Sequence, residues 1–211
     1  MRLFAGLLSA ATAGVALLLG PAALAQPSAA ARDAAMAEVV PPQGVGGCVY
    51  FAMSQEARRA VLLKFLSGEA GIPPALLPAV RQVGPRCSGR PYDDSDLPLV
   101  GAVLGAFRRT SGGMILAQEF AVGQRRLDEA WRTAPPESKA PFYDVADAFL
   151  APDRSITPPA RPFDVAPFAS ELGLEGGGEG RVATHLRRYF LATALSERSE
   201  AQLQARGARP D

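Results

Sequence analysis

One histidine and one glutamate in an apolar stretch are the residues of this chain best suited to acid–base chemistry. His185 is the only histidine, so a Ser–His or Cys–His pair would have to use it, and no G-x-S-x-G motif accompanies it. Glu119 lies within the mostly apolar stretch 114–122, where burial would raise its pKa and suit it to act as a general acid. A glycoside hydrolase needs a second carboxyl at a defined distance, for which Asp144 or Asp147 would have to serve.

Each of these two residues also has a simpler, structural interpretation. His185 is then a solvated or half-buried residue on a helix. Glu119 is then an ordinary carboxylate at the polar edge of a helix, or is paired with Arg108 or Arg109. We therefore treat Glu119 and His185 as weak catalytic candidates.

Arginines along the last predicted helix form the third candidate site. Arg181, Arg187 and Arg188 lie opposite part of the apolar face of this helix, followed by Arg198. Such a basic amphipathic helix can dock in the groove of a partner protein or on lipid head groups. The alternative is a surface helix whose arginines are solvated.

Metal and nucleotide chemistry receive little support from the sequence. The aspartates within 93–96 have hard oxygen ligands suited to calcium, but Pro98 and Leu99 stand where a calcium loop needs a ligand and a glycine. The glycine run 176–180 precedes a helix, as phosphate loops do, yet lacks the Lys and Ser/Thr that bind phosphate. We expect no metal site and no cofactor.

Cys48 and Cys87 are the only cysteines, and we expect them to form a disulfide. The bond would close a loop of about 40 residues and stabilise the fold by roughly 4 kcal/mol in the chain-entropy model. A redox-active pair is disfavoured because there is no C-x-x-C spacing. A zinc site needs four ligands, and two cysteines with one histidine do not supply them.

The first 25 residues have the order of a secretory signal peptide. Arg2 is followed by the uncharged apolar stretch 3–19, then by Gly20 and Pro21, and small residues precede a cleavage site after Ala25. The alternative is an uncleaved anchor, since roughly 20 apolar residues span a bilayer. Cleavage is favoured, and we expect an exported, periplasmic protein without a stable membrane anchor.

The charge balance limits the kinds of partner. The chain has 22 basic and 21 acidic residues, and Arg2 is the only charged residue of the predicted signal peptide, so the mature part is neutral. A neutral chain lacks the basic surface that binds nucleic acid. It also lacks the excess of positive charge that holds a protein on anionic lipid.

Helical periodicity dominates, and no period-2 strand pattern is visible, so we expect an all-α fold. The predicted architecture is an irregular bundle of about five to six helices with one disulfide and a Pro-rich connector before the last helix. After the signal peptide (1–25), the predicted parts are a flexible Ala/Pro/Gly-rich leader (26–47), a helical core (48–150), a Pro/Gly-rich connector (151–180) and a C-terminal amphipathic helix (181–206).

Capping and apolar spacing divide the core further. We expect helices over 55–67, over residues that follow Pro73 and Pro74 and end before Gly84, over 97–107, over 114–132 and over 137–150, with a turn at 110–113. The helix over 97–107 is almost wholly apolar and should be central. Gly101 and Gly105 share one of its faces, which would let another helix approach closely.

The sequence thus favours an exported, non-enzymatic cell-envelope interaction or binding protein that acts through helical surfaces, with an envelope protein as a possible partner. Its best candidates for partner contact are Arg181, Arg187 and Arg188. The alternatives are a periplasmic hydrolase, acting on cell-wall glycan with Glu119 as the acid, and a carrier of a small ligand held between helices.

Overall fold

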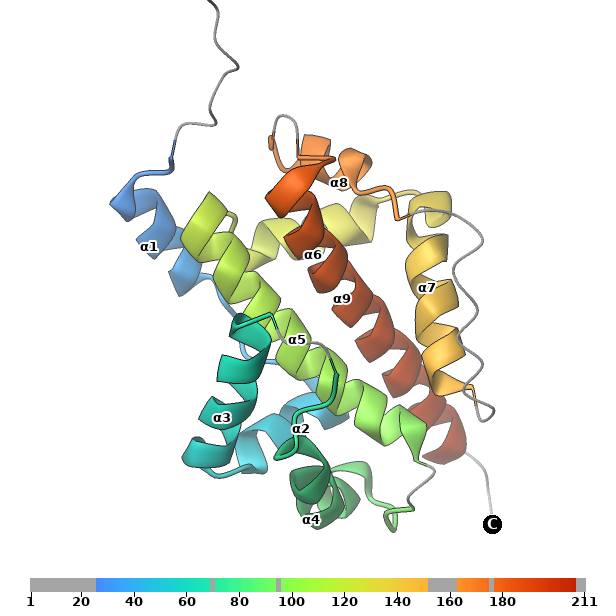
Figure 1. Ribbon diagram of the computed structural model, residues 1–211. Coiled ribbons are helices and arrows are strands. Elements are labelled where there is room, and N and C mark those ends of the chain that lie inside the picture. Colours follow the sequence, from blue (N-terminus) through green and yellow to red (C-terminus); the bar gives the residue numbers. More distant parts are fainter. Residues whose placement is uncertain (1–25, 69–70, 94–95, 152–162, 175–176, 208–211) are drawn as a thin grey trace, which may run out of the picture.

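The computed structural model describes residues 26–68, 71–93, 96–151, 163–174 and 177–207, and it confirms an all-α fold (Figure 1). These residues contain nine helices and no strand. In chain order the helices are α1 (Ala29–Ala37), α2 (Gly44–Ala52), α3 (Gln55–Leu66), α4 (Leu76–Ser88), α5 (Leu97–Phe120), α6 (Gln124–Thr133), α7 (Pro136–Leu150), α8 (Ala166–Glu171) and α9 (Gly180–Gly207). The predicted signal peptide lies outside the described residues.

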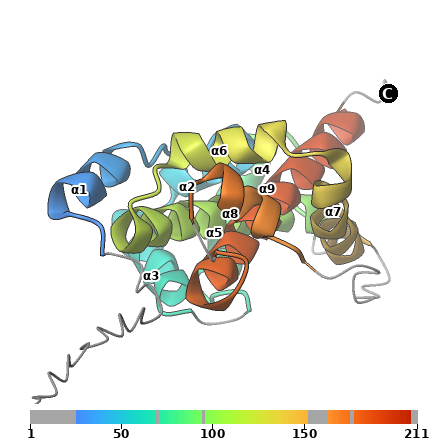
Figure 2. The ribbon, with the colours of Figure 1, turned by 90° about the horizontal axis from the view of Figure 1, so that it is seen from above.

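Two long antiparallel helices, α5 and α9, form the centre of the molecule (Figure 1). Helices α1 to α4 pack against α5, and α7 packs mainly against α9. Seen from above, α3 and α6 lie on opposite sides of α5, so the central pair has an α3 side and an α6 side (Figure 2). None of the described helices is long and apolar enough to cross a membrane.

Glycines set the distance between the two central helices. A Cβ on Gly105 would lie 2.9 Å from the carbonyl oxygen of Ala192, and one on Gly101 would overlap Oγ of Ser199. Farther along the contact, a Cβ on Gly112 would lie 3.4 Å from the Tyr189 ring. The prediction that Gly101 and Gly105 allow a close helix approach is confirmed, and the partner is the C-terminal helix.

The central helix is longer than the sequence pattern indicates. We expected a turn at 110–113, but α5 continues through these residues and ends at Phe120. Gly112 and Gly113 are buried against Tyr189, so they serve helix packing instead of breaking the helix. The chain turns at Ala121, which has φ 53° and whose amide donates to the carbonyls of Ala117 and Leu116.

Short helices account for the difference between the expected and observed helix numbers. Residues 26–47, expected to be a flexible leader, contain α1 and the beginning of α2, and α1 is capped by the Ser28 side chain. Helix α4 does not end before Gly84 as expected but passes through it, and a Cβ there would lie 2.7 Å from Leu99. Helix α8 lies within the expected connector. Residues 152–162 of that connector lie outside the described residues. Helices this short bury too few side chains to give a clear periodic stripe.

The predicted disulfide is present. Cys48 on α2 is bonded to Cys87 on α4, across a sequence separation of 39 residues. Both helices also pack on each other and on α5. The bond therefore joins two elements that cover the same face of the central helix.

Replacing Gly105 by Ala should lower the free energy of unfolding by about 1–3 kcal/mol, because the new methyl group must push α5 and α9 apart. Urea unfolding measures the effect. Gly207→Ala is the matched control, because a Cβ at this helical glycine meets nothing within 4 Å. Equal stability of the two variants would contradict the close contact.

Removal of the disulfide by the double change Cys48→Ala and Cys87→Ala should cost about 4 kcal/mol of unfolding free energy, as expected for a loop of about 40 residues. The same urea experiment on the wild type with and without reductant should give a similar difference. A loss below about 1 kcal/mol would show that the loop is already restrained in the unfolded chain.

Candidate functional site

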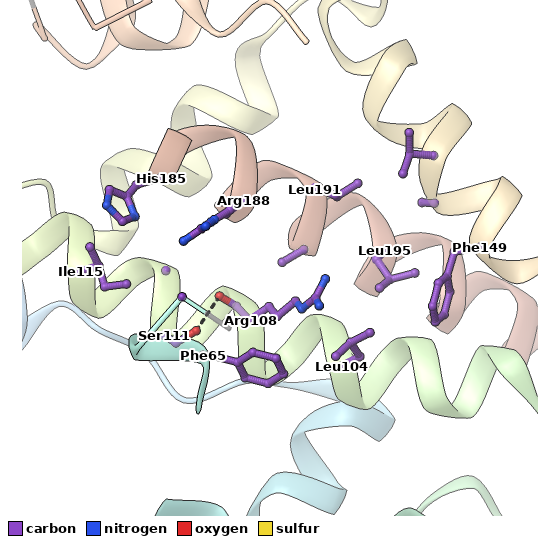
Figure 3. Close-up of a pocket in the computed structure, with 15 residues that line it drawn as sticks. Phe65, Leu104, Arg108, Ser111, Ile115, Phe149, His185, Arg188, Leu191 and Leu195 are labelled. Carbon is purple, nitrogen blue, oxygen red and sulfur yellow. Dashed lines mark hydrogen bonds between the residues drawn. The ribbon is translucent and has the colours of Figure 1, made fainter. Parts of the chain in front are cut away.

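A cavity of about 260 Å³ lies on the α3 side of the central helix pair (Figure 3). Its walls come from α5 and α9, and the end of α3 and one face of α7 complete it. We call it the central groove. It combines side chains from distant parts of the chain, so no local motif marks it.

One half of the central groove is apolar. Leu104, Phe149 and Leu195 line it together with Leu191, and they come from α5, α7 and α9 (Figure 3). Leu104 and Leu195 are buried, whereas Phe149 and Leu191 are half-buried. An apolar ligand placed here would remove these exposed carbon atoms from water.

The other half of the central groove is basic. Arg108 donates from Nη2 to the carbonyl of Gly71 at 3.2 Å, and its guanidinium lies 5.3 Å from the centre of the Phe65 ring. Arg188 lines the groove from α9, with its guanidinium pointing towards the His185 end, and makes no hydrogen bond or ion pair with a described residue (Figure 3). Burial and the nearby charge of Arg188 both lower the pKa of Arg108. Neither arginine therefore has a carboxylate partner within the described part of the chain.

At the end of the basic half, Glu119 and His185 come together. Arg181 Nη2 lies 2.8 Å from Oε1 of Glu119, and Nε2 of His185 lies 4.0 Å from Oε2. That Oε2 is buried and accepts no hydrogen bond from a described residue. The Phe120 ring lies 6.2 Å from the imidazole.

The imidazole of His185 is surrounded by both signs of charge. Burial is the main cause of its lowered pKa, and the charges of Arg188 and Arg181 act in the same direction. Glu119 acts in the opposite direction but does not outweigh them. His185 is consequently neutral at pH 7 and adds no charge to the basic half.

Four of the residues selected from the sequence thus lie in or beside the central groove: Glu119, Arg181, His185 and Arg188. Arg187, the fifth, points elsewhere and donates to the carbonyl of Phe163 at 3.1 Å. The expected pairing of Glu119 with Arg108 or Arg109 is not formed, because Arg181 is its partner.

Asp147, one of the two candidate carboxyl partners of Glu119, lies far from it. Asp147 pairs with Arg198 near the C-terminal end of α9, whereas Glu119 pairs with Arg181 at its beginning. At a rise of about 1.5 Å per residue, these two arginines are about 25 Å apart along the helix. Glycosidase carboxyls are separated by about 5–10 Å.

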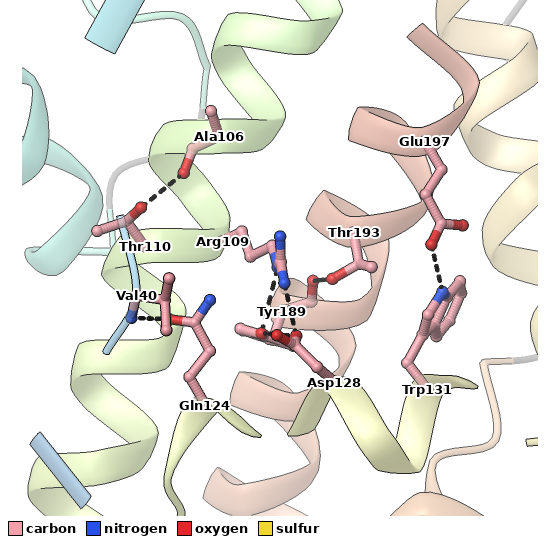
Figure 4. Close-up of polar contacts among 10 residues, drawn as sticks. All are labelled: Val40, Ala106, Arg109, Thr110, Gln124, Asp128, Trp131, Tyr189, Thr193 and Glu197. Atoms are coloured by element: carbon pink, nitrogen blue, oxygen red, sulfur yellow. Dashed lines mark hydrogen bonds and ion pairs between the residues drawn. The ribbon is translucent and has the colours of Figure 1, made fainter. Parts of the chain in front are cut away.

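A polar network that the sequence did not indicate lies on the α6 side of the central pair (Figure 4). Asp128 accepts hydrogen bonds from Arg109 and from the Tyr189 hydroxyl, each at 2.7 Å. Nearby, Glu197 accepts from Trp131 at 2.9 Å and from Tyr143 at 2.6 Å. Burial and the hydrogen bond to Glu197 raise the pKa of Tyr143 to about 12.

This network is suited to holding helices together. The pKa of Arg109 is raised by Tyr189 and Asp128, and burial raises the pKa of Tyr189, so both groups keep their protons at neutral pH. Each carboxylate already accepts hydrogen bonds from two different side chains. The residues come from α5, α6, α7 and α9, which explains why no sequence pattern indicated the network.

The acidic segment before α5 caps this helix. Asp96 is 5% exposed, accepts from the amide of Leu99 at 3.4 Å and lies 3.4 Å from Nη1 of Arg206. Among the residues whose positions are described, no group of three or more His, Cys, Asp or Glu side chains could hold a metal ion.

Comparison of the chain with known proteins finds no matching family model, no similar curated protein and no similar solved structure. The geometry of the central groove is therefore the basis of the functional argument.

Replacing His185 by Gln should flatten the pH dependence of stability. The folded protein holds the pKa of His185 below its usual value, so below about pH 6.5 the unfolded chain binds more protons. The free energy of unfolding of the wild type should therefore fall as the pH goes from 7 to 5, and that of the variant should fall less. Urea unfolding at both pH values measures this. If the free energy of unfolding falls equally in the wild type and the variant, His185 is not buried among these charges.

Proposed function

We propose that this chain is an exported, non-enzymatic binding protein of the cell envelope that carries a small, largely apolar molecule in the central groove. The main observation in support is the cavity of about 260 Å³ between α5 and α9, which is lined by Leu104, Leu195 and Phe149. Cavities lined mainly by apolar residues with a few polar groups are typical of small-molecule sites. The periplasm is the compartment that the predicted signal peptide supports.

Contact with a protein partner through the arginines of α9 is less well supported. Arg181 pairs with Glu119, and Arg187 is bonded to the backbone of Phe163. The apolar face of α9 is covered, with Leu186, Tyr189 and Phe190 fully buried. Arg188 is the one of the three candidates that faces the groove. A hydrolase using Glu119 is also less favoured, because Asp147 of α7 pairs with Arg198, about 25 Å along α9 from Arg181, the partner of Glu119.

Binding of a neutral apolar dye tests this function. N-phenyl-1-naphthylamine fluoresces in apolar surroundings, so the protein should raise its fluorescence. The change Leu191→Trp should reduce binding by about tenfold or more, because the indole ring fills the groove while Leu191 itself is only half-buried.

The matched control is Leu63→Trp, at an exposed leucine of α3 that does not line the groove. It should bind the dye like the wild type, and circular dichroism should show both variants to be equally helical. Absence of dye binding to the wild type, or equal binding by the two variants, would refute the proposed carrier function.

A further inference from the structure

We propose that the ligand of the central groove is a single-chain amphiphile whose anionic head group is bound by Arg108 and Arg188 while its hydrocarbon chain packs against the apolar side chains of the groove. This inference rests on the proposed function, and it adds the chemical class of the ligand and its orientation. Three observations support it: two guanidinium groups without a carboxylate partner among the described residues, their remaining hydrogen-bond donors, and the apolar side chains beside them.

The charge of the basic half is the first observation. Arg108 and Arg188 both line the groove, from α5 and α9, and the described residues place no carboxylate against either (Figure 3). Among the described residues, the acid beside this part of the groove is Glu119, and it is paired with Arg181. Two like charges in a half-buried site repel one another, and a bound anion would remove this repulsion.

The hydrogen-bonding capacity of the two arginines is the second observation. A guanidinium has five N–H donors and binds carboxylates and phosphates through two parallel hydrogen bonds. Among the described residues, Arg108 has one hydrogen bond, to the carbonyl of Gly71, and Arg188 has none. Enough donors therefore remain for a head group with two or three oxygens.

The shape of the groove is the third observation. Leu104, Leu195 and Phe149 line the groove beside the guanidinium of Arg108, which points towards Leu195 (Figure 3). With a volume of about 260 Å³, the groove is small for a ligand site, which suits a short single chain. An eight-carbon chain with a carboxylate is a ligand of this kind.

Three ligands with the same chain test the head group: octanoate, 1-octanol and octylammonium. Isothermal titration at pH 7.5, with the disulfide oxidised, should show octanoate binding at least about tenfold more tightly than octanol, since hydrogen bonds to charged groups are the stronger ones. Octylammonium should bind more weakly still, because both arginines repel it. Octyl phosphate distinguishes the two anionic heads: the tighter of octanoate and octyl phosphate identifies a carboxylate or a phosphate ligand.

Single substitutions test whether the two arginines bind the head group. Arg188→Gln and Arg108→Gln should each weaken octanoate binding by about tenfold while leaving octanol binding unchanged. Arg125→Gln, at an exposed arginine of α6 outside the groove, is the matched control and should leave both unchanged. Because Arg188 is exposed, its variant is expected to fold even where Arg108→Gln does not.

The outcomes separate this inference from the proposed function. Equal binding of octanoate and octanol, or an unchanged preference in Arg188→Gln, would overturn the anionic ligand and leave the carrier function standing. Binding of the neutral dye without binding of any octyl compound would also overturn the inference alone. Failure to bind the dye as well as the octyl compounds would refute both proposals.

Discussion

The close contact between α5 and α9 is the constraint on which the rest of the fold depends. Gly101 and Gly105 bring the backbone of α5 against Ser199, Ser196 and the carbonyl of Ala192, at a distance that any side chain on α5 would prevent. The side chains next to this contact cannot point into it, so they line its two sides. The central groove follows one side and the Asp128 network follows the other (Figures 3 and 4).

Two consecutive arginines show how the side of α5 on which a residue lies determines its partners. Successive residues of an α-helix point about 100° apart, so Arg108 and Arg109 lie on different sides of α5. Arg109 meets Asp128 and the hydroxyl of Tyr189, and its charge is neutralised within the fold. Arg108 meets a ring, a carbonyl and another arginine. The same residue type thus stabilises the structure on one side and is available to a ligand on the other.

The pair of Glu119 and Arg181 has a matching role at the end of the groove. By pairing with Arg181, Glu119 is kept from neutralising Arg188, and burial keeps His185 uncharged. The groove therefore has a basic half and an apolar half instead of a balanced cluster of charges. This polarity is the basis on which we propose a ligand with one charged end.

The sequence by itself determined the helical class, the disulfide between Cys48 and Cys87 and the close approach at Gly101, because periodicity, cysteine count and glycine spacing are local properties. It also selected Glu119 and His185 for acid–base chemistry and Arg181 and Arg188 for contact with a partner. Only the tertiary structure decided that these four lie beside one groove, because antiparallel packing of α5 on α9 brings together residues that are more than 60 positions apart. It also decided that Arg108 faces the groove and Arg109 a carboxylate, since the direction of a side chain depends on which neighbours its helix meets.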